Sequence, residues 1–242
     1  EVHFFNRNRE KGTEWYINLL NSFRNTDSTI VGEKTPWYCW EDSIAKEIHK
    51  LNPDVKLIWL FREPVQRLVS HYNHNLSTGL EINNLPKAIK KESQRIEKNL
   101  QYGYVFGSEY INQVKTYLKY FPIKNMLFLS FEEFIENPND TTNQTLSFLK
   151  KHPLYHINSE IRNKTHLPKF PFLLYLTRRF FNRGSRPFNI AYRINYFMLE
   201  RSKRKTKPSL KTTLALREHF IPQIKELSLL TNKNFLELWY ND

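Results

Sequence analysis

Blocks of apolar residues alternate with polar stretches along the chain, and two blocks have the pattern of buried strands. LIWLF at 57–61 and NMLFLSF at 125–131 are nearly continuous runs of apolar side chains. Such runs are typical of strands covered on both faces, whereas half-exposed strands alternate polar and apolar positions. Shorter extended segments are predicted for EVHFF at 1–5 and for STIVGEK at 28–34.

Helical spacing of apolar residues follows the first buried strand. Val65, Leu68, Val69 and Tyr72 recur at i, i+3, i+4 and i+7, which is one helical face. Pro64 suits the first turn of a helix, where its missing N–H would have no partner. The pattern therefore predicts a helix over 64–77.

Further helices are predicted at five places. The first starts near Thr13, which is its predicted N-cap. The other four cover 41–52, 108–121, 131–152 after a turn, and 209–230 with a break at Pro222. The stretch 80–101 is polar and basic, and we expect a helix and an irregular excursion there.

Strands alternating with helices indicate an α/β fold, a three-layer doubly wound parallel sheet flanked by helices. The 242 residues are enough for one hydrophobic core. We expect a single domain over 1–242, with the α/β core in 1–150 and a basic, mainly helical C-terminal part in 151–242.

Charge is concentrated in the C-terminal part. Thirteen Lys and Arg lie between Lys164 and Lys211 against one acid, Glu200, which accounts for nearly all of the net charge of +13. A solvated basic surface has this pattern, and so does a surface that meets a nucleotide, an acidic glycan, an anionic membrane or nucleic acid. The aromatic residues of this region have the spacing of core or interface positions and could also stack on sugars: Tyr175, Phe180, Phe181, Tyr192 and Tyr196.

The chain has one cysteine, Cys39, which favours a reducing compartment, and we expect a cytoplasmic location. His71 and His74 are spaced i, i+3 on the predicted helix, but no Cys cluster or HExxH motif accompanies them. We expect no metal site.

Arg62 is the first candidate for a functional role. It ends a predicted parallel strand, the place where open α/β sheets bind their ligands. Ser70 lies in the second turn of the following helix, away from its apolar stripe. An arginine and a nearby hydroxyl can hold a phosphate together.

Two other segments carry candidate chemistry. Glu1 and His3 would share one side of an extended segment and could act together as a general base, or could be an exposed acid beside a satisfied histidine. Lys34 follows a predicted strand and precedes Pro36. It is either a surface cation or a group that neutralises developing charge.

Together, EVHFF, GEKTPWY and FREPVQRLVSHY resemble segments of the sulfotransferase family, particularly its carbohydrate and heparan sulfate branch and its bacterial relatives. GSEYINQVKTYLKYFPIKNMLFLSFEEFIENP, LSFL, RNKTHLPK and NKNFLELW extend the resemblance over nearly the whole chain, most specifically 1–138.

The resemblance implies roles for individual residues. Glu1 matches the base that takes the acceptor's proton, His3 a histidine that assists it, and Lys34 a lysine that contacts the sulfuryl group or the acceptor. Arg62 and Ser70 match the pair that binds the 3′-phosphate of the donor, 3′-phosphoadenylyl sulfate (PAPS). Arg162, Lys164 and Thr165 resemble a late loop that closes over the nucleotide. The implied acceptor is a carbohydrate hydroxyl or an amine.

The resemblance also implies a P-loop nucleotide-hydrolase-like fold, with one departure. Family members carry a strand, a phosphate-binding loop and a helix before the EVHFF segment, whereas this sequence begins at Glu1. We therefore expect an N-terminally incomplete sulfotransferase without the first strand and phosphate loop, inactive as it stands.

Three alternatives remain open. A P-loop nucleotide kinase would share the architecture, with Glu63 as the one carboxylate beside Arg62. A nucleic-acid-binding module would rest on charge alone, since no recognised motif is present, and we expect no specific nucleic acid partner. The basic, aromatic segment 170–188 could make a peripheral contact with a membrane surface.

Overall fold

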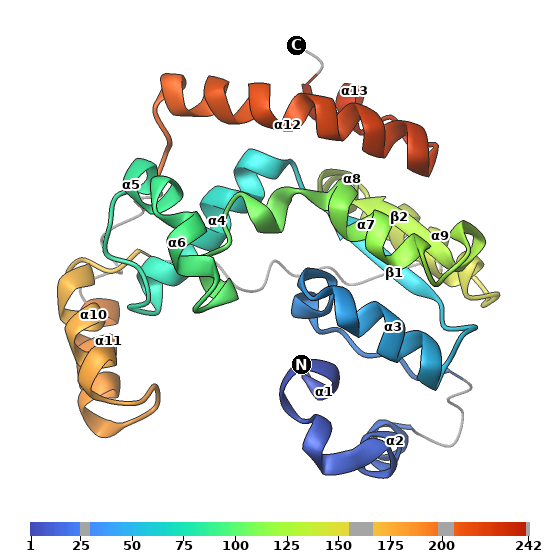
Figure 1. The fold of residues 1–242 in the computed structure, drawn as a ribbon, viewed down its shortest axis with the longest axis horizontal. Helices are drawn as coiled ribbons and strands as arrows, with labels where there is room; N and C mark the ends of the chain where they lie inside the picture. The colour runs from blue at the N-terminus through green and yellow to red at the C-terminus, as the bar shows by residue number, and fades with distance from the viewer. Residues whose placement is uncertain (25–29, 155–166, 198–205, 241–242) are drawn as a thin grey trace. The chain divides into compact units, whose positions relative to one another are not determined.

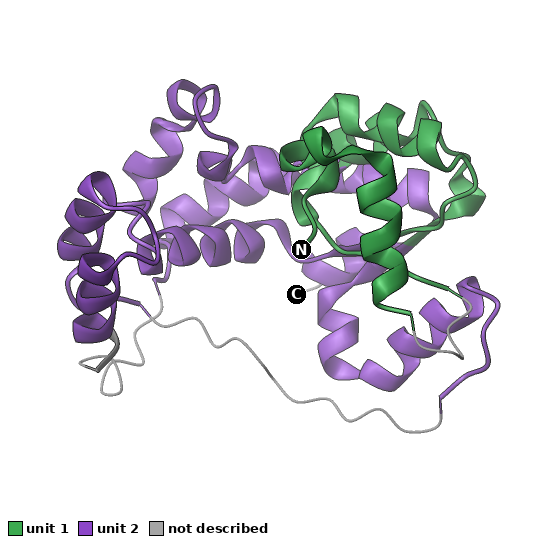
Figure 2. Cartoon of the chain, turned by 90° about the horizontal axis from the view of Figure 1, so that it is seen from below, with its two compact units in different colours: residues 1–58, 111–127 green, residues 59–110, 128–242 purple. Residues whose placement is uncertain are grey.

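The computed structural model describes residues 1–24, 30–154, 167–197 and 206–240, with the side chains of 196 and 197 excepted. It divides into two compact units (Figure 2). Unit 1 comprises Glu1–Ile58 and Ile111–Leu127, and unit 2 comprises Trp59–Tyr110 and Phe128–Asp242. This division differs from the expected change at residue 150, and the single-domain organisation stays a prediction.

Both strongly apolar runs form strands. β1 (Leu57–Phe61) and β2 (Met126–Ser130) are neighbours in a two-stranded parallel sheet (Figure 1). The α/β class is thereby confirmed. The three-layer, doubly wound arrangement stays a prediction.

The expectation that β1 is covered on both faces is wrong for the described residues. Trp59 and Phe61 are buried, whereas Ile58 and Leu60 remain 44% and 50% exposed. The described elements pack against one face of the strand only.

Two predicted extended segments are also wrong. Residues 4–7 form α1 (Phe4–Arg7), because His3 takes the left-handed conformation at φ 54° and turns the chain so that Phe4 stacks on Tyr16 at 4.3 Å. Residues 30–34 are in neither strand nor helix, since no described strand runs beside them to complete a ladder, and 28–29 lie outside the described residues.

Unit 1 is mainly helical. Besides α1 it contains α2 (Gly12–Ser22), α3 (Asp42–Leu51) and nearly all of α7 (Tyr110–Leu118). Lys11, and not Thr13 as predicted, occupies the N-cap of α2, because the chain enters this helix through Gly12 at φ 82°. Tyr117 of α7 donates a hydrogen bond to the Tyr38 carbonyl (3.1 Å), which fixes the turn η2 (Pro36–Trp40) after Lys34.

In unit 2, β1 is followed by α4 (Pro64–Ser77), whose bounds are the predicted ones. The polar stretch after it contains α5 (Leu85–Lys90) and α6 (Glu92–Ile96), organised around Glu81, which is fully buried. The Glu81 carboxylate accepts hydrogen bonds from Arg95 (2.7 Å) and from the Tyr104 hydroxyl (2.9 Å). This buried network explains how so polar a stretch folds compactly.

Unit 2 also contains the end of β2 and further helices in its described residues. It contains α8 (Phe131–Glu136), α9 (Pro138–Phe148), α10 (Pro171–Phe180), α11 (Arg186–Phe197), α12 (Leu210–Thr231) and α13 (Phe235–Tyr240). None of the helices in the described ranges combines the length and the apolar character that a bilayer span requires.

The predicted break at Pro222 is wrong, because α12 runs through it. The buried side chains of Phe220 and Ile224 on either side pack the helix into unit 2 and offset the hydrogen bond that proline cannot donate. Phe61 packs against Phe128 (6.1 Å between ring centroids) and Phe235 (5.6 Å), so the end of β1 lies in an aromatic core shared with α13.

Candidate active site

The peptide bond after Arg62 is held on both sides. Its carbonyl accepts a hydrogen bond from the Tyr110 hydroxyl (2.9 Å), and its N–H, that of Glu63, donates to Glu132 Oε1 (2.9 Å). Since both polar groups of this peptide are satisfied by side chains, the direction in which Arg62 leaves β1 is fixed.

The Arg62 guanidinium lies over the Phe131 ring, 5.0 Å from its centroid, and its Nη2 donates to Gln66 Oε1 at 3.3 Å. Its Nε is buried and has no hydrogen-bond partner among the described residues. A buried N–H without a partner is costly, and an anion that accepts from it would remove that cost.

Ser70 lies on the same face of α4 as Gln66, one turn further along, because residues four apart are stacked on a helix. The half-buried Ser70 hydroxyl makes no hydrogen bond with a described residue. Arg62, tied to Gln66, therefore reaches the helix face that carries Ser70. The unpaired Nε and the free hydroxyl suit a phosphate group.

A feature absent from the sequence prediction supports this turn from the C-terminus. Glu63 caps α4 by accepting from the N–H groups of Val65 (3.2 Å) and Gln66 (2.7 Å), and it also accepts from the Tyr240 hydroxyl (2.7 Å). Glu132 Oε2 accepts from Trp239 Nε1 (2.9 Å). An acid before Pro64 could have indicated the cap, but no local signal indicated the partners on α13.

In unit 1 the structure brings Glu1 and His3 together, as predicted, although not through an extended strand. His3 Nε2 lies 3.0 Å from Glu1 Oε2, and its Nδ1 lies 3.3 Å from Asn6 Oδ1. The His3 backbone N–H donates to Thr35 Oγ1 (3.3 Å). The imidazole is thus held at both nitrogens, with Glu1 more exposed than His3.

Thr35 ties the Lys34 loop to this pair. Its hydroxyl donates to Glu33 (3.3 Å), which also accepts from the Tyr16 hydroxyl (2.8 Å). Burial, and then the hydrogen bond to Glu33, raises the pKa of Tyr16, and burial raises the pKa of Tyr38 to about 12. Both phenols therefore stay protonated donors at neutral pH.

Lys34 is exposed and makes no ion pair with a described residue. Its ammonium is therefore available to a bound group. Of the predicted site residues, Glu1, His3 and Lys34 belong to unit 1, and Arg62 and Ser70 belong to unit 2. Arg162, Lys164 and Thr165 lie outside the described residues.

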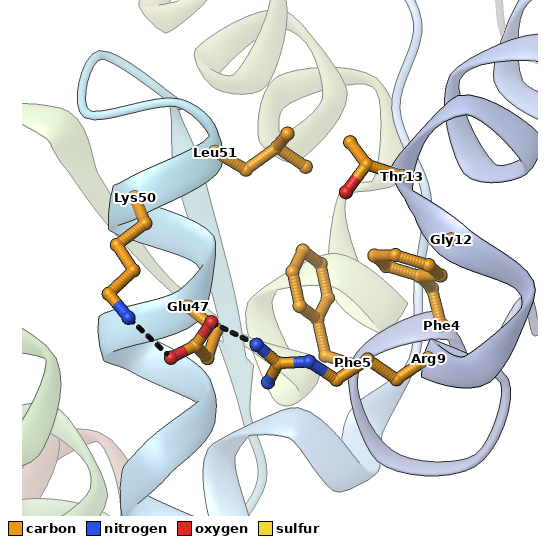
Figure 3. A pocket seen from close by; sticks show the side chains of 8 residues that line it. All are labelled: Phe4, Phe5, Arg9, Gly12, Thr13, Glu47, Lys50 and Leu51. Atoms are coloured by element: carbon orange, nitrogen blue, oxygen red, sulfur yellow. Dashed lines mark hydrogen bonds and ion pairs between the residues drawn. The ribbon is translucent and has the colours of Figure 1, made fainter.

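A pocket of about 250 Å³ in unit 1 contains none of the predicted site residues. Phe4, Phe5 and Leu51 line it, together with Glu47, which pairs with both Arg9 and Lys50 (Figure 3). Hydrogen bonds from Lys50 and then Arg9 lower the pKa of Glu47. The charged side chains of the wall are thus paired with one another.

The described residues contain no group of three or more His, Cys, Asp or Glu that could hold a metal ion. His71 is close to Arg67 (3.4 Å from Nη2 to Nδ1) and to the Tyr104 ring (5.1 Å between centroids). Burial, and then the charge of Arg67, lowers its pKa to about 3.

Comparison with known proteins gives a family match. The model of the sulfotransferase domain matches residues 3–171. Heparan sulfate glucosamine 3-O-sulfotransferase 3B1 of Homo sapiens is 32% identical over 149 residues, which are 62% of this chain and 38% of that protein. Heparan sulfate glucosamine 3-O-sulfotransferase 5 of Mus musculus is 31% identical over 143 residues, which are 57% of this chain and 41% of that protein. The matches thus span well under half of these relatives.

A crystal structure of a sulfotransferase from Alicyclobacillus acidocaldarius shares the fold, with a TM-score of 0.67 at 19% identity. The similarity covers 95% of this chain and 74% of that one. It extends beyond residue 171, where the family match ends.

Proposed function

Because this chain belongs to the sulfotransferase domain family, we propose that it transfers a sulfuryl group from PAPS to a hydroxyl or amine of an acceptor, most simply a carbohydrate. The observation that carries this proposal is the Arg62 turn. Arg62 is half-buried, follows the carboxyl end of a parallel strand, and reaches the face of α4 that carries Ser70. Neither its Nε nor the Ser70 hydroxyl has a hydrogen-bond partner among the described residues.

Arg62 and Ser70 hold the 3′-phosphate of the donor in this proposal. Arg62 donates to the phosphate from Nε and from its other guanidinium N–H groups. Ser70 donates from its hydroxyl, which can rotate toward the phosphate. The donor supplies the activated sulfuryl group. The phosphate compensates the unpaired N–H of Arg62, and so the nucleotide is selected by its second phosphate.

Glu1 accepts the proton of the acceptor, and His3 orients the Glu1 carboxylate through the 3.0 Å contact. The contacts of His3 with Asn6 and Thr35 keep the imidazole in place for this task. Lys34, exposed and without an ion-pair partner among the described residues, offsets negative charge on the group in transfer.

The carbohydrate acceptor is supported by the relatives, which are named for the 3-O-sulfation of heparan sulfate glucosamine. The kinase alternative has no comparable support. Its candidate magnesium ligand, Glu63, caps α4 and accepts from Tyr240.

Calorimetric titration with adenosine 3′,5′-bisphosphate and with adenosine 5′-monophosphate tests the nucleotide site. The chain should prefer the bisphosphate, and Arg62→Ala should abolish the preference. We expect a loss of roughly 1.5–3 kcal/mol for a charged hydrogen bond. Arg193→Ala removes an equal charge from an exposed position and is the matched control. Equal affinities of wild type and Arg62→Ala for the bisphosphate would contradict the assignment.

Sulfuryl transfer to a heparan-type oligosaccharide, followed by mass spectrometry, tests the catalytic roles. It is measured in the shortest form of the protein, this chain or a longer one containing it, that turns over. Glu1→Gln should lower turnover by roughly 10²–10⁴-fold with nucleotide affinity unchanged. Turnover close to that of the wild type would exclude Glu1 as the base.

A further inference from the structure

Helices α10 and α11 form a hairpin outside the proposed nucleotide site. They lie side by side (Figure 1), and their inner faces bury Leu174, Phe188 and Ala191. The side chain of Asn195 on α11 accepts a hydrogen bond from the Phe170 N–H (2.8 Å) at the start of α10. The two helices therefore form one packed element.

The hairpin is fixed to the end of α4. Arg178 Nη1 donates to the Thr78 carbonyl (2.8 Å), and Gly79, at φ 70°, packs so closely that a Cβ there would lie 2.6 Å from the Leu174 carbonyl oxygen. Through these contacts the inner face of α10 is buried against the end of α4. The outer surface of the hairpin therefore has a defined orientation within unit 2.

That outer surface is apolar and basic on both helices. α10 exposes Phe172, Leu176, Arg179 and Phe180, which are spaced i, i+4, i+7 and i+8 on one face. α11 exposes Arg186, Ile190, Arg193 and Ile194 with the same spacing. The possibility that the aromatic residues here are core positions is wrong for Phe180, Phe181 and Tyr192, which are exposed, whereas the side chain of Tyr196 is not described.

The two stripes meet at the turn between the helices, residues 179–187, which we call the tip. Phe180 is 70% and Phe181 45% exposed there, beside the exposed Arg179, Arg183 and Arg186. No acidic residue occurs anywhere in 167–197. Two exposed phenylalanines among three arginines are unusual on a surface that contacts only solvent.

We propose that the tip docks on an anionic lipid bilayer, with Phe180 and Phe181 in the boundary between headgroups and acyl chains and the three arginines on lipid phosphates. This combination of basic and large apolar side chains is what interfacial segments use. Lipid is favoured over an acidic glycan because the stripes also expose Leu176, Ile190 and Ile194. These aliphatic side chains offer a polyanion neither a positive charge nor a hydrogen-bond donor, whereas they can contact acyl chains.

Vesicle co-sedimentation tests the proposal, with phosphatidylcholine vesicles that do or do not contain phosphatidylserine. The wild-type chain should sediment with the anionic vesicles. Phe180→Ser/Phe181→Ser should weaken this binding by roughly tenfold or more. Arg179→Gln/Arg183→Gln should weaken it by about fivefold per arginine, and only with phosphatidylserine present.

Phe23→Ser is the matched control, because Phe23 is 66% exposed but belongs to unit 1 and is not part of the tip. It should leave vesicle binding unchanged. Thermal unfolding of each variant should match the wild type, since all these side chains are exposed.

Three results would overturn the proposal. The wild type could fail to sediment with anionic vesicles, or Phe23→Ser could weaken binding as much as the double serine variant does. The third is binding to dextran sulfate, without vesicle binding, that the arginine variant loses and the phenylalanine variant keeps. That last result would assign the tip to an acidic glycan.

Discussion

Tyr240→Phe tests how strongly α13 supports the turn that carries Arg62. Tyr240 donates to Glu63 Oε1 at 2.7 Å, and Glu63 is 4% exposed. Without this donor, the described residues leave Oε1 only the N–H of Val65 at 3.2 Å, at the long end of hydrogen-bond distances. Phenylalanine keeps the ring, which the Arg217 guanidinium approaches to 4.9 Å from the centroid.

A hydrogen bond to a charged group contributes about 1.5–3 kcal/mol. Since the carboxylate is buried and left with one weak donor on that oxygen, we expect the free energy of unfolding to fall by about 2 kcal/mol, within this range. Urea unfolding followed by tryptophan fluorescence measures the change. The dependence on urea concentration should stay the same, because the surface exposed on unfolding is unchanged.

The same substitution should reduce the loss of unfolding free energy that occurs as the pH rises above about 10. Burial, and then the hydrogen bond to Glu63, raises the pKa of Tyr240 above its value of about 10 in the unfolded chain. Its contribution is complete below about pH 10 and is lost as the pH rises further, because the unfolded tyrosine ionises first. Tyr175→Phe is the control, since Tyr175 makes no hydrogen bond with a described residue. An unfolding free energy equal to that of the control variant would refute the reasoning.

Three further changes have defined outcomes. Glu81→Ala should cost about 3–5 kcal/mol of unfolding free energy in urea titrations, because it leaves the Arg95 guanidinium without its buried partner. Gly79→Ala should cost more than about 1 kcal/mol and speed proteolysis of the hairpin, because the residue has φ 70° and its Cβ would meet Leu174. His71 stays neutral in the folded protein, so stability should fall as the pH drops from about 6.5 towards about 3, and His71→Gln should reduce this fall in urea titrations at about pH 7 and about pH 4.5.

Local signals explain what the sequence could predict. β1 and α4 follow from an apolar run, a proline at the first helical position and a regular apolar stripe. The proximity of Glu1 and His3 follows from their separation by one residue, even though the backbone there turns at His3 instead of extending.

Features set by distant parts of the chain were missed. The helix at Phe4 depends on stacking with Tyr16, and the support of the Arg62 turn depends on Tyr240, 177 positions after Glu63. No local sequence signal indicates the exposed face of β1 at Ile58 and Leu60 either. An apolar run does not indicate which elements pack against each face of the strand.

A crystal structure of the chain with adenosine 3′,5′-bisphosphate tests the central claim most directly. The account predicts the 3′-phosphate within hydrogen-bonding distance of Arg62 Nε and Ser70 Oγ, which would give the buried N–H its partner. A nucleotide bound elsewhere, or bound with Arg62 still paired only with Gln66, would contradict it.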